Sequence, residues 1–230
     1  MQKIAFFDVD KTIFRGYSEN ILFEYIEKNN ILRNHPYTKI MGINKKYANR
    51  ELTYNDAVDN VIETIANSVK GETVEKMADV AGQVLKENED LFEKWFFPVY
   101  DKLKKKDFKC VLISGATEII IKNIAEYIDK DIEYYCTKLV IEDAKYTGAI
   151  SVRMNGISKR EIIENTEAYS KDVLTLGFGD SPGDIPMLEV VDHAFLFEQE
   201  DHPEMIEVAK DKGWTVFRDE NTLLPIIEDL

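Results

Sequence analysis

Short apolar runs divide the chain and predict buried strands. Three of them, Ile4–Phe7, Phe108–Ile113 and Val173–Gly179, are too short for helices and contain few polar residues. Strand-like runs also occur at residues 192–197 and 214–217. Between most of these runs, apolar residues recur at helical spacing. This alternation predicts an α/β fold in which helices flank a mostly parallel central sheet.

Helical spacing continues without a strand-like run from about residue 15 to residue 88. Within this block, Thr53 and Asp56 form a capping arrangement that an apolar stripe follows. A plain helical bundle with its own core accounts for most of these residues. Because the block interrupts an α/β chain directly after its first strand, we expect an inserted all-helical domain at 15–88 and an α/β core at 1–14 and 89–230.

Local signals predict further element boundaries. Ser18 is a candidate N-cap for the first inserted helix, and Ser158 is one for a later helix that extends through Tyr169. A helix is expected at about 90–106. A hairpin is also expected, from two short strands at 132–136 and 138–141, the second of which can pair with 146–152.

Aspartates follow two of the predicted strands. Asp8 and Asp10 come directly after the first strand, at the edge where open α/β sheets bind ligands. Two carboxylates this close repel each other and need a cation, a shared proton or a phosphate partner. The alternative is a polar exit from the strand, in which Asp10 and Thr12 make only local turn hydrogen bonds. Asp180 and Asp184 follow the strand at 173–179 and can face the same crevice. The alternative, helix capping, explains one of these aspartates but hardly both.

The strand at 108–113 ends in Ser114-Gly115-Ala116-Thr117, and a helix is predicted next. A hydroxyl and backbone N–H groups at a helix start suit the binding of an oxyanion. Capping of that helix by Ser114 or Thr117 explains the same residues. Lys159 lies in the first turn of a later helix, where the helix dipole does not favour a cation. A ligand role for Lys159 and an ordinary solvated lysine both stay open.

Charge and the lack of targeting patterns exclude several classes of protein. With 29 basic and 43 acidic residues the net charge is −14, so the chain lacks the clustered cations of a nucleic-acid-binding protein. No apolar run reaches about 18 residues and no signal-type segment precedes the first strand, so we expect a cytoplasmic protein without a membrane partner. Cys110 and Cys136 lie in apolar surroundings and are predicted to be buried free thiols. The chain has neither GxGxxG nor a P-loop, and its histidines show no metal-binding spacing.

Taken together, these features resemble the haloacid dehalogenase superfamily of aspartate-nucleophile phosphatases. Four stretches match its motifs: FFDVDKT, VLISGAT, the Lys159 segment GISKREIIE, and GFGDSPGDIPML. The resemblance covers essentially the whole core and is greatest for the phosphoserine phosphatase-like branch (subfamily IB), whose helical C1 cap is likewise inserted between the first two motifs. It implies a Rossmann-like core with the helical block as its cap.

The resemblance implies a role for each residue at the strand ends. Asp8 is the expected nucleophile, which forms an aspartyl phosphate, and Asp10 is the expected acid and base. Oxygen-only surroundings favour Mg²⁺ as the cofactor. Its expected ligands are Asp8, Asp10, Asp180 and the Val9 carbonyl. The expected phosphate contacts are Ser114, Gly115 and Lys159, with Thr12 and Asp184 in supporting positions.

In this branch, residues of the cap determine which substrate is bound. Phosphoserine phosphatases hold the ammonium and carboxylate of their substrate with a glutamate after the first motif and with a cap arginine. Here Glu19 is shifted from the glutamate position, and Asp59 stands where the arginine is expected. The candidate replacements for that arginine are Arg15, Arg50 and Lys46. We therefore expect chemistry like that of phosphoserine phosphatases without strict specificity for phosphoserine.

The resulting hypothesis is an Mg²⁺-dependent phosphomonoester hydrolase that acts on a small phosphorylated metabolite. It includes no nucleic-acid partner and makes no prediction of the oligomeric state. One alternative is a phosphotransferase or mutase on the same core. The other is a phospho-accepting signalling module of the receiver type. Receivers carry the accepting aspartate on their third strand and have no helical insertion after the first, which counts against this second alternative.

Overall fold

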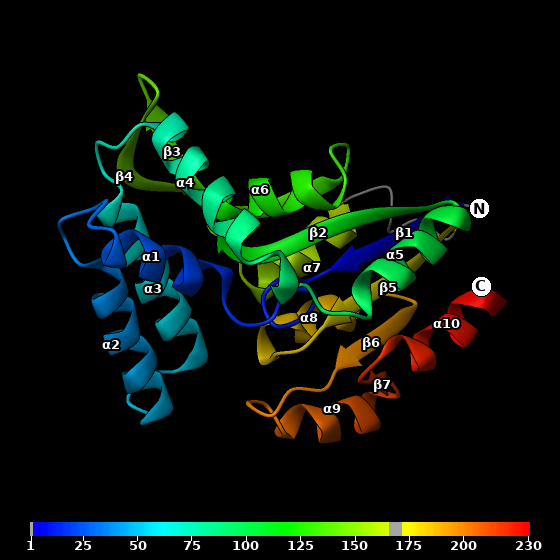
Figure 1. The fold of residues 1–230 in the computed structure, drawn as a ribbon. Coiled ribbons are helices and arrows are strands. Elements are labelled where there is room, and N and C mark those ends of the chain that lie inside the picture. Colours follow the sequence, from blue (N-terminus) through cyan, green and yellow to red (C-terminus); the bar gives the residue numbers. More distant parts are fainter. Residues whose placement is uncertain (1, 166–171) are drawn as a thin grey trace.

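A seven-stranded sheet forms the centre of the chain (Figure 1). The structure is a computed structural model that describes residues 2–165 and 172–230. The strand order is β4-β3-β2-β1-β5-β6-β7, and every neighbouring pair is parallel except β3 and β4. The strands are β1 (Gln2–Phe7), β2 (Phe108–Thr117), β3 (Glu133–Glu142), β4 (Lys145–Val152), β5 (Val173–Gly179), β6 (His193–Phe197) and β7 (Thr215–Phe217). The predicted α/β fold with a mostly parallel sheet is confirmed.

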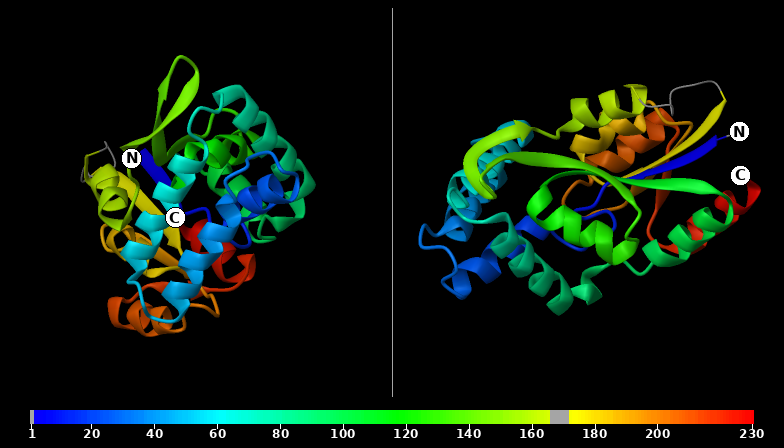
Figure 2. Two further views of the ribbon diagram at one scale, coloured as in Figure 1. Left: turned by 90° about the vertical axis from the view of Figure 1, so that its left-hand side faces the viewer. Right: turned by 90° about the horizontal axis from the view of Figure 1, so that it is seen from above.

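Helices cover both faces of this sheet, as the right-hand view of Figure 2 shows. One face packs against α5 (Phe96–Lys105), α6 (Glu118–Ile128) and α10 (Glu220–Asp229). The other packs against α7 (Gly156–Asn165), α8 (Ile185–Leu188) and α9 (Glu204–Lys212). Along β1, Ala5 and Phe7 belong to the first core, while Ile4 and Phe6 belong to the second, because successive side chains of a strand point to opposite faces. A strand buried on both faces reads as a continuous apolar run, which is the pattern that predicted β1.

A helical insertion follows β1, as predicted. Its elements are α1 (Ser18–Lys28), α2 (Pro36–Ala48), α3 (Tyr54–Ser68), α4 (Val74–Glu87) and η1 (Glu89–Leu91), after which α5 leads into β2. In Figure 1, α1, α2 and α3 lie at the left, beyond the ends of the parallel strands. The β3–β4 hairpin supports the insertion, since Gly71 N–H donates to the Tyr146 carbonyl (2.8 Å) and Val74 N–H to the Ala144 carbonyl (3.0 Å). These bonds hold the insertion beside the strand ends.

The structure corrects two predicted N-caps. Tyr17, not Ser18, is the N-cap of α1, and the buried Ser18 Oγ has no hydrogen-bond partner within the described residues. The Ser18 N–H instead donates to the Asp10 carboxylate at 2.9 Å, so a side chain from the core takes the place of a local cap. In α7, which starts before Ser158, the Asn155 side-chain oxygen accepts the Ser158 N–H at 3.0 Å. Asn155 therefore provides the cap that Ser158 was expected to provide.

Two predicted element boundaries are also wrong. The helix expected at 90–106 becomes α-helical only at Phe96. Backbone hydrogen bonds of 2.7 and 2.9 Å tie Leu91 and Glu93 to the segment that leaves β1, and they keep this stretch out of the helix. The two strands expected between residues 132 and 141 form the single strand β3.

The strand predicted at 108–113 continues through Thr117 as β2, so the expected polar turn at Ser114–Thr117 belongs to the strand. Three other predictions of local structure are confirmed. Thr53 and Asp56 form a capping box at the start of α3, and β3 pairs with β4 as the expected hairpin. Cys110 and Cys136 are buried and free. The expected extension of α7 through Tyr169 lies outside the described residues. No helix in the described part of the chain combines the length and apolar character that a bilayer crossing requires.

Candidate active site

Three neighbouring strand ends place polar residues at one edge of the sheet. β1 lies between β2 and β5, and the three strands run in the same direction. Asp8 follows β1, Ser114 lies near the end of β2 and Asp180 follows β5, and all three line one cavity. After β1 the chain first adds β2, β3 and β4 on one side of β1, and it later adds β5, β6 and β7 on the other side. In open α/β sheets such a switch point forms a binding crevice.

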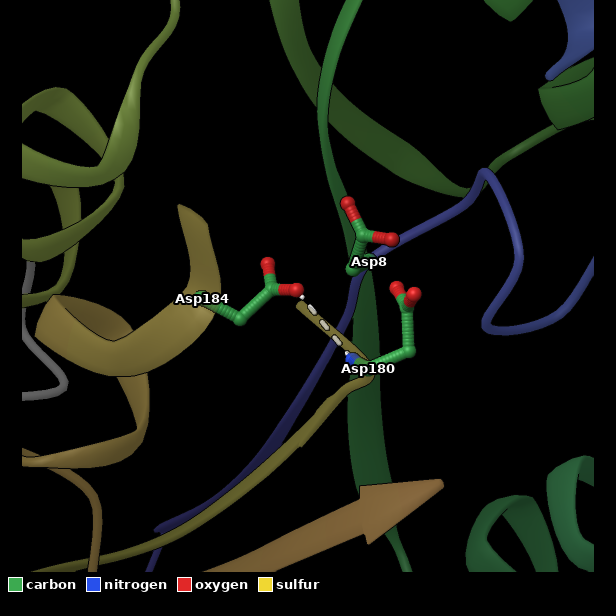
Figure 3. Close-up of side chains that lie close together, drawn as sticks. All are labelled: Asp8, Asp180 and Asp184. Carbon is green, nitrogen blue, oxygen red and sulfur yellow. Dashed lines mark hydrogen bonds between the residues drawn. The ribbon is translucent and has the colours of Figure 1, made fainter. Parts of the chain in front are cut away.

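Asp8, Asp180 and Asp184 form a buried acidic cluster (Figure 3). One carboxylate oxygen of each residue lies within 4.8 Å of the others. Asp184 belongs to the short helix η3 (Pro182–Asp184), and its Oδ2 accepts the Asp180 N–H at 3.2 Å, as the dashed line in Figure 3 shows. Gly179 permits this approach, because a Cβ at that position would lie 2.6 Å from Asp184 Cβ. Because Gly179 has no side chain, the turn after β5 can bring Asp180 and Asp184 close together.

Lys159 and Thr12 connect these carboxylates. The buried Lys159 ammonium, carried by α7, donates to Asp8 Oδ1 at 2.5 Å and to Asp184 Oδ1 at 2.7 Å. The buried Thr12 hydroxyl lies 2.9 Å from both Asp8 Oδ2 and Asp180 Oδ1, with one proton to donate. These partners explain a lysine in the first turn of a helix. One ammonium against three carboxylates leaves an excess of negative charge.

Burial and repulsion raise the pKa of two carboxyls of the cluster, those of Asp8 and Asp180. Burial raises the pKa of Asp8 to about 7, Asp184 adds to the effect, and Lys159 opposes it. Burial, followed by Asp184 and Asp8, raises the pKa of Asp180 well above its usual range. Burial lowers the pKa of Lys159, but Asp184 and Asp8 more than offset this and raise it above its usual value. Full ionisation of the cluster is therefore disfavoured unless a further cation lies among the carboxylates.

The cluster has the donor set of a site for a divalent cation. The atoms that the cluster offers to a metal are all carboxylate oxygens, and Mg²⁺ takes oxygen ligands in proteins. Asp180 Oδ2 is buried and makes no hydrogen bond within the described residues. An unpaired buried carboxylate oxygen is costly, and a cation beside Asp8 and Asp180 would offset that cost. The residues present therefore fit Mg²⁺.

The other two predicted metal ligands differ in their surroundings. Asp10 lines the cavity, and its Oδ1 accepts the Ser18 N–H at 2.9 Å. Burial raises the pKa of Asp10, while the hydrogen bond from the Ser18 N–H opposes the rise. The Val9 carbonyl accepts three backbone N–H groups of the following turn at 3.0 to 3.2 Å. These bonds engage the Val9 carbonyl oxygen and disfavour it as a metal ligand.

The predicted phosphate contacts Ser114 and Gly115 line the same cavity as Lys159. Ser114 Oγ accepts the Ala116 N–H at 3.2 Å, which orients the hydroxyl and leaves its proton for a ligand. The Gly115 carbonyl accepts the Thr137 hydroxyl at 2.7 Å. These bonds hold the end of β2 in place just before α6 begins.

A cavity of about 300 Å³ separates these core residues from the insertion. Glu19 lines it and is buried, with its carboxylate accepting the Thr117 N–H at 2.7 Å. Burial raises the pKa of Glu19 to about 7. The three predicted cationic candidates do not line this cavity: Arg15 and Arg50 are exposed elsewhere, and Lys46 lines a separate groove.

Sequence reasoning missed three tyrosines that line the cavity from the insertion side, namely Tyr17, Tyr47 and Tyr54. Tyr54 is the first residue of α3, and its hydroxyl lies 3.5 Å from Ser181 Oγ. Gly183 leaves room for this ring, because a Cβ there would lie 2.7 Å from the Tyr54 hydroxyl. The capping box at Thr53 marks the start of α3, and it is the one local sequence signal for the position of the Tyr54 ring. No local sequence signal indicates that Tyr17 or Tyr47 lines the cavity.

Asp59, which stands where a cap arginine was expected, also lines the cavity. Arg153 Nη1 lies 2.7 Å from Asp59 Oδ1, and Arg153 Nη2 lies 3.3 Å from Glu63 Oε1. These ion pairs join α3 to the segment that follows β4. The Asp59 charge is thus already compensated by a residue of the core.

Comparisons of sequence relate the chain to one family of enzymes. A family model described as haloacid dehalogenase-like hydrolase matches residues 5–189. A probable phosphatase from Mycobacterium tuberculosis is 30% identical over 108 residues, which make up 46% of this chain and 37% of that protein. The match therefore spans little more than a third of the length of this curated relative.

Comparisons of structure show the same fold in solved proteins. A protein of unknown function from Bordetella pertussis Tohama I has a TM-score of 0.79 at 17% identity, over 94% of this chain and 98% of that one. A substrate-bound phosphoserine phosphatase has a TM-score of 0.66 at 17% identity, over 98% of both chains. At these identities the likeness concerns the fold, with its helical insertion after the first strand.

Proposed function

The chain belongs to the haloacid dehalogenase-like hydrolases, and on that basis we propose that it is an Mg²⁺-dependent phosphomonoester hydrolase. Its substrate is a small phosphorylated metabolite, and its intermediate is an aspartyl phosphate. The proposal is carried by one observation: Asp8, Lys159 and Asp180 face the same cavity. Hydrolysis of phosphate monoesters is among the slowest uncatalysed reactions, and a covalent intermediate divides it into two easier steps.

Asp8 is the proposed nucleophile and Asp10 the proposed acid and base. A carboxylate oxygen of Asp8 bonds to phosphorus, the bond from phosphorus to the ester oxygen breaks, and Asp10 gives a proton to the leaving alcohol. The raised pKa of Asp10 suits the first role of this residue. Asp10 then takes a proton from water, whose oxygen bonds to phosphorus and displaces Asp8. Phosphate leaves, and both aspartates return to their starting states.

Ser114, the Gly115 N–H and Lys159 are the proposed contacts to the phosphate oxygens. Charge shifts among these oxygens in the transition state, and donors that are already oriented stabilise it. Asp184 supports this set, because it holds the Lys159 ammonium at 2.7 Å. Thr12 supports it by its 2.9 Å contact to the nucleophile.

Asp8, Asp10 and Asp180 would hold Mg²⁺. When bound, this ion offsets the negative charge of the carboxylates and of the phosphate. The buried Asp180 Oδ2, which lacks a hydrogen bond within the described residues, supports this assignment most directly. Asp184 lies close enough to join the cluster, and its bond to Lys159 argues for a supporting role.

We propose that residues 1–14 and 89–230 form the catalytic core and that residues 15–88 form the cap. The packing of α5 against β2 and α10 supports its place in the core. The cap side of the cavity determines which ester enters. Because Asp59 is paired with Arg153 and stands where an arginine was expected, we do not propose strict specificity for phosphoserine.

Turnover of p-nitrophenyl phosphate by the purified protein with Mg²⁺ tests this function. Asp8→Asn should abolish turnover, because an amide is a poor nucleophile. Asp211→Asn is the matched control, since Asp211 is an exposed aspartate on α9, and it should turn over like the parent. Full turnover by Asp8→Asn would remove the nucleophile assignment.

Product analysis separates hydrolysis from the two alternatives. If phosphate appears on an added acceptor alcohol instead of in solution, the protein is a phosphotransferase. If acetyl phosphate leaves a lasting aspartyl phosphate without turnover, the protein acts as a receiver-type module. The family match supports hydrolysis, so inorganic phosphate is the expected product.

A further inference from the structure

The cavity between the core and the insertion offers a substrate no unengaged cation. Among the described residues that line it, Lys159 is the one cationic side chain, and it donates to Asp8 and Asp184 at the phosphate end. A carboxylate or a second phosphate on the leaving alcohol would give up its water without gaining a cationic partner, and burying an unpaired charge is costly. Anionic alcohols are therefore disfavoured in this cavity.

The acidic residues on the insertion side do not require a cationic alcohol either. Asp59 is paired with Arg153 at 2.7 Å. Glu19 is buried, and burial raises its pKa to about 7, so its carboxyl is largely uncharged below this pH. A protonated carboxyl donates a hydrogen bond, as a hydroxyl does. The insertion side therefore holds little uncompensated charge.

Uncharged polar side chains also line the cavity. Asn20 on α1 is half-buried there, as are Asn44 and Tyr47 on α2. Neither the Asn20 amide nor the Tyr47 hydroxyl makes a hydrogen bond within the described residues. The Asn44 amide has one weak contact, from its Nδ2 to the Met41 sulfur at 3.9 Å. Because an amide both donates and accepts, these groups can bond to hydroxyls in either sense.

Helix α3 adds an apolar surface to the same cavity. The lining residues with apolar side chains on this helix are Ala57, Val58, Val61 and Ile62, which recur at helical spacing. A polyol presents C–H groups beside its hydroxyls, so it matches a lining of apolar and uncharged polar side chains. A purely apolar alcohol would displace water from the amides of Asn20 and Asn44 without replacing the lost hydrogen bonds.

We infer that the leaving alcohol is uncharged and carries at least one further hydroxyl, so that the substrate is the phosphate monoester of a small polyol. Asn20, Asn44 and Tyr47 bond to its hydroxyls, and its carbon atoms pack on α3. The inference rests on the proposed function. The polyol is small because the cavity of about 300 Å³ also holds the phosphate and lies at the lower end of the usual range for ligand pockets.

A matched set of phosphate monoesters tests the inference. 2-Hydroxyethyl phosphate, propyl phosphate and phosphoethanolamine differ only in the terminal group, which is a hydroxyl, a methyl or an ammonium, and phosphoglycolate supplies a carboxylate. We expect kcat/KM for the hydroxyl ester to be about fivefold above that of the methyl ester, which is the effect of one neutral hydrogen bond. Both charged esters should react more slowly than the hydroxyl ester. Equal values for the hydroxyl and methyl esters, or a preference for either charged ester, would overturn the inference.

Variants test the assigned side chains through the ratio of kcat/KM for the hydroxyl ester to kcat/KM for the methyl ester. An effect on the chemical step that both esters share cancels in this ratio. Asn20→Leu and Asn44→Leu keep the approximate size and remove the amide, so each should lower the ratio. Asn49→Leu is the matched control, because Asn49 is exposed at the end of α2 and does not line the cavity. An unchanged ratio in both cavity variants would overturn the assignment.

Turnover of p-nitrophenyl phosphate separates failure of this inference from failure of the proposed function. If that ester is not cleaved, the hydrolase proposal fails and the inference falls with it. If that ester is cleaved while the hydroxyl and methyl esters react equally, the inference alone fails.

Discussion

Glu19 makes the stability of the fold depend on pH. Its carboxyl is buried, and burial raises its pKa from 4.5 to about 7. The folded protein therefore keeps the Glu19 proton up to about pH 7, whereas the unfolded chain loses it above about pH 4.5. The folded state binds more protons across this window. The free energy of unfolding consequently falls as the pH rises through it, and the contribution of Glu19 is fully favourable below the window.

The size of the effect follows from the same pKa values. One pKa unit corresponds to about 1.4 kcal/mol, so the difference between 4.5 and about 7 corresponds to about 3 kcal/mol. Glu19→Gln cannot titrate, and its side-chain oxygen can still accept the Thr117 N–H. The variant should therefore gain stability relative to the parent as the pH rises.

Urea unfolding in EDTA at several pH values measures this gain. The isoelectric point of about 4.8 favours precipitation at low pH, so the series runs from about pH 5.5 to about pH 8.5, where about 2 kcal/mol of the effect remains. The quantity of interest is the change with pH in the stability difference between variant and parent. This difference cancels the titration of the acidic cluster, which both proteins share.

A partly exposed glutamate on the same helix serves as the control. Glu24 pairs with Lys28 at the surface of α1, and Glu24→Gln should change the stability difference by less than about 0.5 kcal/mol over the series. If Glu19→Gln gains no stability over the parent between the two ends of the series, the buried carboxyl does not titrate as argued. An equal gain of stability in Glu19→Gln and Glu24→Gln would also show that the Glu19 carboxyl does not titrate as argued.

Two further predictions concern the loop after β5. In Gly183→Ala the new Cβ would meet the Tyr54 hydroxyl at 2.7 Å, so we expect kcat/KM to fall about tenfold and to recover in part when Tyr54→Phe removes that hydroxyl. Steady-state assays with p-nitrophenyl phosphate measure both, and full activity of Gly183→Ala would contradict the contact. Mg²⁺ at a hundred times its Kd should stabilise the EDTA-treated protein by about 2.7 kcal/mol in urea titrations. Asp180→Asn should lose most of this gain, and an equal gain in the variant would exclude Asp180 from the metal site.

The parts of the fold that could be predicted are those set by neighbours in sequence. The apolar run of β1 predicts a strand buried on both faces, and its alternation between two cores confirms this. The capping box of Thr53 and Asp56 likewise predicts the start of α3, because both partners lie within one helical turn. The convergence of Asp8 and Asp180 follows from the rule that ligand sites gather at the ends of parallel strands. In each case the information is local or topological.

The parts that could not be predicted depend on contacts between distant segments. Ser18 has the composition of an N-cap, yet the Asp10 carboxylate accepts its N–H, so a tertiary contact replaces the local one. The turn after β1 directs the Val9 carbonyl into three backbone bonds, which spacing alone does not reveal. Tyr47 reaches the cavity because α2 lies beside α3, and no sequence period reports that neighbour. Side chains of the insertion are therefore the least predictable part of the site.

A line of side-chain contacts joins the insertion to the proposed nucleophile. The Tyr54 hydroxyl lies 3.5 Å from Ser181 Oγ, which donates to Asp184 Oδ2 at 2.9 Å. Asp184 Oδ1 accepts from Lys159, and Lys159 donates to Asp8. The last three residues of this line are buried, where hydrogen bonds are electrostatically stronger than in water. A shift of α3 that withdraws Tyr54 changes the partners of Ser181 and, through Asp184, the surroundings of Lys159. The position of the insertion thus bears on the proposed nucleophile through bonded side chains as well as by covering the cavity.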